Sequence, residues 1–487
     1  MPAQRKPART VAAAPVKPAR RTAGLILIAL GALLLVVVAV WAFLLSRPQT
    51  EISGRFITTP AQGPVEAAAP LSVEVNLDLR AGQGSGTRLA PIVNLQLRDA
   101  AGQPAAFGPG PMAYLPMNIS GKVTRWVADL SAPTVPGTYH MHILARVAGQ
   151  PDMEFDLRDP ALQVVAATPF QGGLVYSRNG NLWRSDAQGG HARRLTYYTD
   201  DGRADSPAWS PDGKRIAYTR TLPAPSSDIP NTEIWSIDPD GGSPQVLAAR
   251  RSGEDLITPA FGPDGALYFT SDRTVDPDTN ATPTMDRLTA GVESWSVERL
   301  APAAPDGSRG TVLPAARMPD VSHDGTQIVY ISAPDAAAES ESFITHTLML
   351  ADSDGRNPRP LFPPDLYQDV LAPRFSPDGT QVAFAAVTPL EVPSGEFDLL
   401  RALGLAPLPA RANGVPWDIY LAPVAGGQIT RLTRLNADQP VVAWSNDGKR
   451  LALLDEKGLF LLDLADPAAL HQVGPPSSHG QLDWYDR

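Results

Sequence analysis

Two histidines placed two residues apart are the pair in this sequence best suited to bind a metal. His140 and His142 lie in the segment TYHMHI, where the alternation of a β-strand puts both imidazoles on one face. The same region of the chain contains four methionines: Met112, Met117, Met141 and Met153. Imidazole and thioether groups are ligands that suit copper, so the pattern indicates a copper site at the two histidines. The alternative is that the histidines lie on the surface and the methionines fill the core.

Carboxylates are the second group with possible chemistry. Asp205, Asp255 and Asp320 precede predicted strands, where their oxygens could face a common channel and bind calcium, as in a metal-dependent lactonase. Their spacing alone does not define a coordinated set. The sequence has no cysteine and no GxSxG segment, which excludes a disulfide framework, a cysteine nucleophile and an α/β-hydrolase nucleophile elbow. We therefore expect a protein without catalytic residues and without a cofactor.

A repeated sequence motif predicts the turns and strands that position these residues. It occurs as WSPDGKRIAY, FGPDGALYF, VSHDGTQIVY, FSPDGTQVAF and WSNDGKRLAL. In each copy Asp-Gly makes a tight turn, because glycine adopts positive φ without steric cost, and an apolar strand follows. The turn residues, for which we expect a structural role, are Asp212, Gly213, Asp264, Gly265, Asp324, Gly325, Asp378, Gly379, Asp447 and Gly448.

The repeated units each contain a second hairpin, as in EIWSIDPDGGSPQVL, so each unit has four strands. The first unit, which begins at Gly173, lacks the strand with the aromatic residue. The C-terminal segment GQLDWYDR places Trp484 where Trp444 stands in its own repeat. We therefore expect the last strand to complete the first unit, which gives six units in a closed ring.

The phrase [WF]SPDG, an apolar strand, IW or IY and a closing RLT together resemble the TolB-type propeller repeat, a WD40-like or PD40 repeat. The resemblance covers residues 170–487, with departures at FGPDG and VSHDG. It implies a six-bladed β-propeller. For function it implies a binding or scaffold module that engages a protein or peptide partner of the cell envelope.

Residues 71–168 do not contain the repeat, but they alternate as short strands, for example in SVEVNLDL and RWVADL. Turn signals separate these strands, so we expect a small immunoglobulin-like β-sandwich. Residues 46–70 are rich in Pro, Ala and Thr and are predicted to form a stalk. The predicted fold class is therefore all-β, with a sandwich before the propeller.

The N-terminal region predicts attachment to a membrane. Residues 24–45 are uncharged and long enough for a transmembrane helix, and six basic residues lie in the tail at residues 1–23. The tail is therefore expected in the cytoplasm and the bulk of the chain outside it, as a single-pass protein of the cell membrane. A cleaved signal peptide is the alternative.

Beyond the tail, 35 Lys and Arg stand against 51 Asp and Glu, which argues against a nucleic-acid partner. Two insertions, residues 271–292 and 387–416, are candidate recognition loops, and the second contains a possible amphipathic helix. The combined prediction is a membrane-anchored, extracytoplasmic binding or scaffold protein. The alternative is a metal-dependent, lactonase-like propeller enzyme or a copper-binding envelope protein.

Overall fold

The structure is a computed structural model of the 487-residue chain. It describes residues 36–38, 49–58, 63–80, 88–122, 124–198, 202–223, 231–251, 253–275, 292–302, 308–332, 346–387, 417–435, 437–476 and 480–486. Nearly all the regular structure in these ranges is β-strand; one short 3-10 helix, Pro364–Leu366, lies between β26 and β27. The predicted all-β fold class is therefore confirmed.

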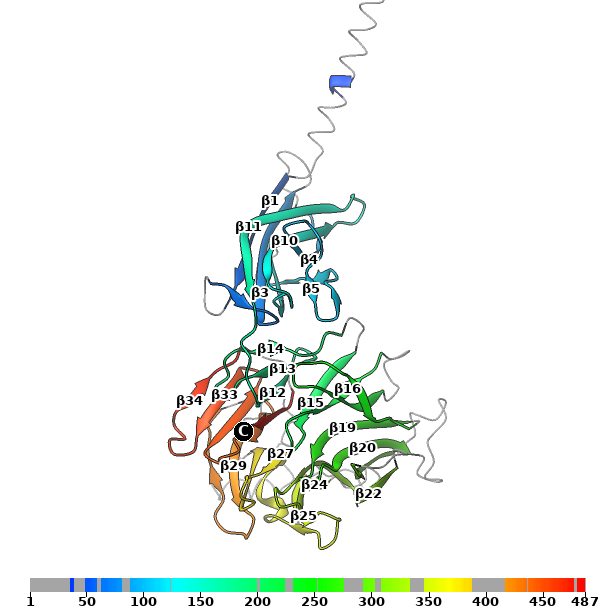
Figure 1. The fold of residues 1–487 in the computed structure, drawn as a ribbon, viewed down its shortest axis with the longest axis vertical. Coiled ribbons are helices and arrows are strands. Elements are labelled where there is room, and N and C mark those ends of the chain that lie inside the picture. The colour runs from blue at the N-terminus through cyan, green and yellow to red at the C-terminus, as the bar shows by residue number, and fades with distance from the viewer. Residues whose placement is uncertain are drawn as a thin grey trace, which may run out of the picture.

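Two sheets packed face to face form the N-terminal domain (Figure 1). The first sheet, in spatial order, contains β1 (Gln49–Ile57), β3 (Pro70–Arg80), β9 (Arg125–Ser131) and β8 (Asn118–Ile119). The second contains β2 (Val65–Glu66), β11 (Met153–Val165), β10 (Gly137–Arg146), β4 (Ile92–Asp99) and β7 (Leu115–Pro116). A small hairpin joins β5 (Ala106–Phe107) to β6 (Gly110–Pro111). Alternate apolar residues such as Val73, Val75, Leu95 and Leu97 fill the space between the sheets.

The predicted stalk at residues 46–70 was wrong, because part of this segment belongs to the sandwich. Strand β1 pairs antiparallel with β3 along its whole length, from Gln49 opposite Arg80 to Ile57 opposite Ser72. Ile52 and Phe56 pack against the core on alternate positions. The Pro, Ala and Thr content that suggested a stalk therefore hid a strand whose period-2 pattern is short and interrupted by Gly54.

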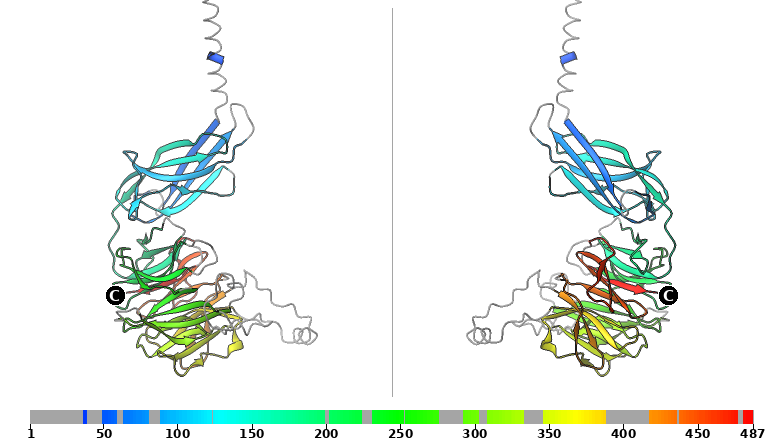
Figure 2. Two further views of the ribbon diagram at one scale, coloured as in Figure 1. Left: turned by 90° about the vertical axis from the view of Figure 1, so that its right-hand side faces the viewer. Right: turned by 90° about the vertical axis from the view of Figure 1, so that its left-hand side faces the viewer.

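The described residues from 170 onward form six four-stranded antiparallel sheets (Figures 1 and 2). The first three, from the innermost strand outward, are β35 (Leu482–Tyr485), β12 (Gly173–Arg178), β13 (Asn181–Ser185), β14 (Arg193–Arg194); β15 (Arg203–Trp209), β16 (Ile216–Thr221), β17 (Thr232–Ile237), β18 (Gln245–Ala248); and β19 (Glu254–Phe261), β20 (Leu267–Val275), β21 (Val292–Leu300), β22 (Arg309–Pro314). The other three are β23 (Ala316–Val321), β24 (Gln327–Ser332), β25 (Thr347–Asp352), β26 (Arg359–Pro360); β27 (Asp369–Phe375), β28 (Gln381–Val387), β29 (Trp417–Pro423), β30 (Thr430–Arg431); and β31 (Val441–Trp444), β32 (Arg450–Asp455), β33 (Gly458–Asp463), β34 (Leu470–Gln472).

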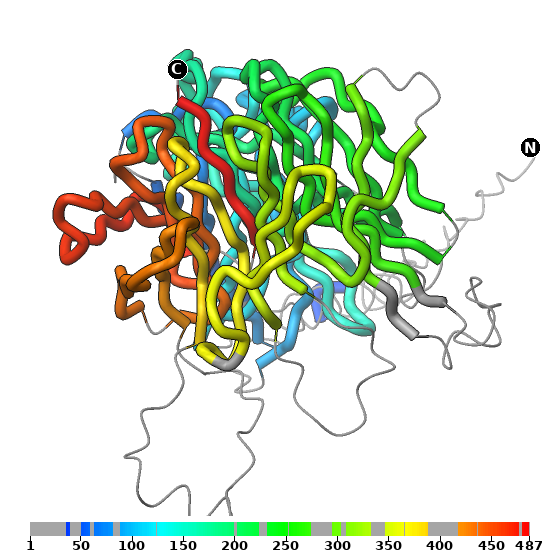
Figure 3. The backbone as a smooth tube through the Cα atoms, turned by 90° about the horizontal axis from the view of Figure 1, so that it is seen from below, coloured from blue at the N-terminus to red at the C-terminus, as the bar shows by residue number. Residues whose placement is uncertain are grey.

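The innermost strands close a ring. Each contacts the innermost strand of the next sheet, and β35 contacts both β31 and β15 (Figure 3, red strand). Strand β35 pairs with β12 in the register Leu174 to Trp484, which is the pairing that the repeat predicted for the C-terminal segment. The apolar middle strands are buried on both faces, as the consecutive apolar residues of the repeat require: Tyr176, Tyr218, Phe269 and Phe384 are fully buried.

The sandwich rests on the outer strand of the first propeller sheet. The backbone N–H of Arg194 donates to the carbonyl of Ala68 at 3.0 Å. The ring of Tyr197 packs edge-on against Phe107 of the β5–β6 hairpin, with 5.1 Å between ring centroids. These contacts join the two domains through both backbone and side chains.

The expected location, a single-pass protein of the cell membrane, is contradicted. In the ranges that the structure describes, no helix is long and apolar enough to cross a membrane. Most of the predicted span at residues 24–45 lies outside the described residues, which include only three helical residues of it, Val36 to Val38.

Candidate functional site

The Asp-Gly turns of the repeat fix one end of each inner hairpin. In the fifth sheet, Ser376 Oγ donates to Asp378 Oδ1 at 2.6 Å, and Gly379 has φ of 69°. The hydroxyl hydrogen bond lowers the pKa of Asp378, as the matching serines lower those of Asp212, Asp324 and Asp447. In the third sheet Gly262 replaces the serine, and Asp264 instead accepts from Arg299 at 2.6 Å. The side chains of these aspartates are therefore engaged in turn geometry.

A strained residue directly before a proline recurs in the inner strands or just before them. Each of these non-glycine residues has φ near 50°, where β-carbon sterics disfavour an ordinary residue. They are Ser206, Thr258, Met318, Ala372 and Gln439. In four sheets the ladder register shifts here, for example between Arg317 and Asp320 and between Leu371 and Arg374. Such a bulge interrupts the alternation of side chains between the two faces of a strand. In these two strands the pairing resumes at Asp320 and at Arg374.

Three charged side chains line one cavity inside the ring of innermost strands, at the end of the central channel where the Asp-Gly turns lie. Asp320, Arg374 and Asp483 each directly precede the first residue of the repeat phrase or its equivalent, on β23, β27 and β35. Asp320 accepts a 2.7 Å hydrogen bond from the backbone N–H of Phe375, and Asp483 accepts one of the same length from Trp209. Both carboxylates therefore bridge neighbouring sheets.

The surrounding protein disfavours the ionised form of both carboxylates, Asp320 and Asp483. Both keep some solvent contact through the channel, but desolvation raises the pKa of Asp320 to about 6 and also raises the pKa of Asp483. Arg374 opposes both shifts by attraction, and the charge of Asp483 adds to the shift at Asp320. Among the described residues, no carboxylate lies within 4.0 Å of the Arg374 guanidinium, whose one hydrogen bond is to the carbonyl of Pro373.

A cavity of about 390 Å³ surrounds this charged group, and we call it the channel mouth. Aromatic and apolar side chains form much of its wall, among them Phe375, Trp444 and Trp484. Exposed His323 and Asn446 lie at its edge in the repeat turns. The channel mouth therefore offers hydrogen-bond donors and acceptors beside aromatic side chains, an arrangement that can bind a ligand.

Of the three aspartates predicted to face a channel, only Asp320 lines this cavity. Asp205 accepts from Ser177 Oγ at 2.6 Å and from the N–H of Ser206, which joins the first two sheets. Asp255 accepts from the N–H groups of Asn231 and Thr232 and thereby fixes the loop before β17. The calcium-binding trio is therefore not assembled.

The predicted copper ligands His140 and His142 do share one face of β10, but they have carboxylate neighbours. His142 Nδ1 lies 2.6 Å from Asp156 Oδ1, and its Nε2 lies 3.5 Å from Glu154 Oε2. His140 is also buried, and this burial lowers its pKa.

The methionines do not supply the soft donors that the copper prediction required. Met141 occupies the opposite face of β10, in the core, and the sulfur of Met112 accepts from the N–H of Leu97. Met117 is buried in the same core, and Met153 packs against it. In the described part of the chain, no group of three or more His, Cys, Asp or Glu side chains is placed to hold a metal ion.

Most of each predicted recognition loop lies outside the described residues. These parts are residues 276–291 of the first loop and residues 388–416 of the second, which include the possible amphipathic helix. Arg374 and Asp483 are the site residues that sequence reasoning missed. Superimposing the repeats on their aromatic residue would have found them, because the preceding position is alanine in three units and charged in three: Ala208, Ala260, Ala443, Asp320, Arg374 and Asp483.

The fold and the site together define a β-propeller with an appended sandwich and a polar channel mouth. No protein-family model matches the chain. It is 29% identical over 187 residues to an uncharacterized protein of Agrobacterium fabrum, which covers 38% of this chain and 55% of that protein. It is 26% identical over 296 residues to a protein TolB homolog of Chlorobium luteolum, which covers 56% of this chain and 60% of the relative. The chain thus spans a little over half the length of these curated relatives.

Among solved structures, TolB from Acinetobacter baumannii has 15% sequence identity and a TM-score of 0.44, over 72% of this chain and 80% of that one. The curated homologue and the ring of sheets support a TolB-like β-propeller fold. They do not assign a partner to the chain.

Proposed function

We propose that this chain is a binding or scaffold protein whose propeller engages a protein or peptide partner of the cell envelope at the channel mouth. We interpret the six sheets as blades of one TolB-like propeller and the N-terminal domain as an immunoglobulin-like sandwich. The observation that carries the proposal is the charged group of Asp320, Arg374 and Asp483 in a cavity that aromatic side chains also line. The match to a TolB homologue points to the same class of function.

The chemistry of the channel mouth suits a peptide. A peptide backbone presents both N–H donors and carbonyl acceptors, and an extended segment needs both kinds of partner. Arg374 can donate to a carbonyl or a carboxylate, whereas the remaining lone pairs of Asp320 and Asp483 can accept. Phe375 and Trp444 supply apolar contact for a side chain between these polar groups.

A peptide selection tests this proposal. A random peptide library is selected on the full chain, and the enriched peptides are measured against the wild type, Arg374→Ala and Arg356→Ala. Arg356 is an exposed arginine that pairs with Asp354 in the turn between β25 and β26 and does not line the channel mouth, so its removal is the matched control. We expect an enriched sequence family whose binding is lost in Arg374→Ala and kept in Arg356→Ala. Failure to enrich any peptide, or equal binding to both variants, contradicts the proposal.

The alternative, a lactonase-like metal enzyme or a copper-binding protein, stays a prediction. Within the described ranges the structure offers no specific observation that favours it over peptide binding. Elemental analysis of the purified full chain separates the two. A stoichiometric metal whose loss lowers the melting temperature would favour the alternative.

A further inference from the structure

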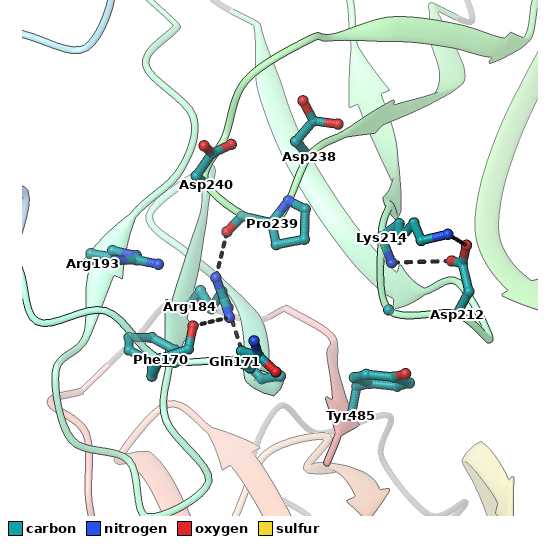
Figure 4. Close-up of a pocket in the computed structure, with 12 residues that line it drawn as sticks. Phe170, Gln171, Arg184, Arg193, Asp212, Lys214, Asp238, Pro239, Asp240 and Tyr485 are labelled. Atoms are coloured by element: carbon teal, nitrogen blue, oxygen red, sulfur yellow. Dashed lines mark hydrogen bonds and ion pairs between the residues drawn. The ribbon is translucent and has the colours of Figure 1, made fainter. Parts of the chain in front are cut away.

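A second cavity, of about 570 Å³, lies where the chain enters the propeller, and we call it the entry pocket. It lies between the first and second sheets (Figure 4). Arg184 and Arg193 come from the first sheet, and Phe170 precedes it. Lys214 and Asp240 come from turns of the second sheet, and Tyr485 closes the remaining side.

Arg184 is a buried cation that no carboxylate neutralises directly. Its side chain donates to three backbone carbonyls: to Gly172 at 2.9 Å, to Pro239 at 2.9 Å and to Phe170 at 3.0 Å. It is 3% exposed, and its guanidinium carbon lies 4.4 Å from the centroid of the Phe170 ring. Desolvation and the neighbouring charge of Arg193 lower the pKa of Arg184 to about 10, so it stays cationic at neutral pH.

Arg193 shares the same aromatic ring. Its guanidinium carbon lies 4.6 Å from the centroid of Phe170, and its Nε is buried without a hydrogen-bond partner. Among the described residues no carboxylate lies within 4.0 Å of either guanidinium, and the Arg193 side chain makes no hydrogen bond. The buried Nε of Arg193 lacks an acceptor, which costs free energy, whereas the rest of this half-buried side chain is open to water or to a ligand.

The other charges that line the pocket do not cancel this pair. Asp238 is paired with Arg215 at 2.5 Å, and Asp212 with Lys214 at 3.3 Å. Asp240 attracts both arginines but lies beyond ion-pair distance. The lining has three basic and three acidic side chains, so its formal charges balance, but neither ion pair involves Arg184 or Arg193. Glu66 of the sandwich also attracts Arg193, but it is hydrogen-bonded to Thr168 and His191.

We propose that the entry pocket binds a small ligand through an oxyanion, a carboxylate or a phosphate, held by Arg193 beside Arg184. A planar guanidinium presents parallel N–H groups that match the two oxygens of such an anion. Stacking on Phe170 orients the Arg193 guanidinium, and Tyr485 supplies an apolar and polar surface for the rest of the ligand. The site is separate from the channel mouth, so it stands or falls independently of the proposed function.

Titration of the full chain with inorganic phosphate, and separately with succinate, tests this inference at ionic strength held constant with sodium chloride. Tryptophan fluorescence and the melting temperature are the readouts. We expect saturable binding that weakens at least tenfold in Arg193→Gln and is unchanged in Arg356→Gln, the matched exposed arginine. Arg193→Lys, which keeps the charge but not the planar fork, is expected to bind between the wild type and Arg193→Gln.

The two probes distinguish the ligand class. Binding of phosphate alone assigns a phosphate ligand, binding of succinate alone assigns a carboxylate ligand, and comparable binding of both assigns a general oxyanion site. The inference is overturned if neither probe binds saturably, or if a folded Arg193→Gln binds as the wild type does. If Arg193→Gln does not fold, wild-type affinity in Arg193→Lys overturns the claim that the planar fork matters.

Discussion

The carboxylate of Asp483 accepts a 2.7 Å hydrogen bond from the backbone N–H of Trp209, a residue 274 positions earlier in the chain. This bond joins β35 to β15, the two strands that meet where the ring closes. Asp483→Ala leaves the Trp209 N–H without its acceptor, so we expect a loss of about 1–3 kcal/mol in the free energy of unfolding. Urea unfolding measures the loss, with exposed Asp354→Ala as the control.

The same variant has a local readout. The N–H of Ser177 on β12 donates to the carbonyl of Gln481, just before β35. If Asp483 fastens the closing strand, the Ser177 amide exchanges its hydrogen faster in Asp483→Ala than in Asp354→Ala. Equal exchange in the two variants would mean that the closing strand is held without Asp483.

Asp320 at the channel mouth is expected to make the stability of the protein depend on pH. Asp320 has a folded pKa of about 6 against an ordinary value of 3.8, so the folded state holds this proton more tightly than the unfolded state. Its contribution to stability therefore falls as pH rises between these two values and is fully unfavourable above the folded pKa. A shift of this size corresponds to at most about 3 kcal/mol.

Asp320→Asn keeps an acceptor for the N–H of Phe375 but cannot ionise. We expect it to unfold at higher urea concentration than the wild type at about pH 8, with the difference vanishing at about pH 4. Unfolding curves at both pH values check this, with Asp354→Asn as the control. A variant less stable than the wild type at the higher pH would show that the charge of Asp320 is needed for the fold.

Two glycines of the propeller, Gly173 at the start of β12 and Gly379 in the turn after β27, differ in the space around them. Gly173 has φ of 96°, and a β-carbon there would lie 2.0 Å from the carbonyl oxygen of Ser185, whereas Gly379 has φ of 69° with open space around it. Gly379→Ala therefore meets only the left-handed backbone cost of about 1–2 kcal/mol. Gly173→Ala adds a backbone clash, so we expect a loss of at least about 3 kcal/mol. Similar melting temperatures for the two variants would contradict this account.

A buried ionic network in the third sheet is expected to be sensitive to the loss of one charge. Glu254 is fully buried and pairs with Arg309 and with Arg273, which lies 2.9 Å away. Burial alone would raise the pKa of Glu254, but hydrogen bonds from Ser271 and from the N–H of Arg251 and the charge of Arg309 leave it lowered. Glu254→Gln leaves the arginines less compensated, so we expect a loss of about 3–5 kcal/mol in urea unfolding. A loss as small as that of exposed Asp354→Asn would show that Glu298 compensates both arginines by itself.

The repeat predicted more of the propeller than of the site. Trp484 identified the closing strand, because its position in the phrase is the same as that of Trp444. The positions of the Arg374 and Asp320 side chains at the channel depend on the bulges at Ala372 and Met318. The period-2 pattern of a strand does not predict which residue has a positive φ. The site could therefore be located on the inner strands but not assembled from the sequence.

The sequence predicts less of the sandwich than of the propeller, because the contacts of the sandwich are long-range. His142 and Asp156 are brought together by the register of β10 and β11, which the sequence does not specify. The pairing of β1 with β3 likewise crosses a segment whose composition resembles a linker. The spacing of the two histidines alone therefore indicates a metal site, whereas the strand register places carboxylates beside them.

The affinity of one selected peptide for the full chain tests the central claim most directly. Calorimetric titration compares the wild type with Arg374→Ala at the channel mouth and with Arg356→Ala in the turn between β25 and β26. We predict binding at least about tenfold weaker to Arg374→Ala, equivalent to about 1.4 kcal/mol, and unchanged binding to Arg356→Ala. Equal affinity for all three proteins would contradict the assignment of the channel mouth as the binding site.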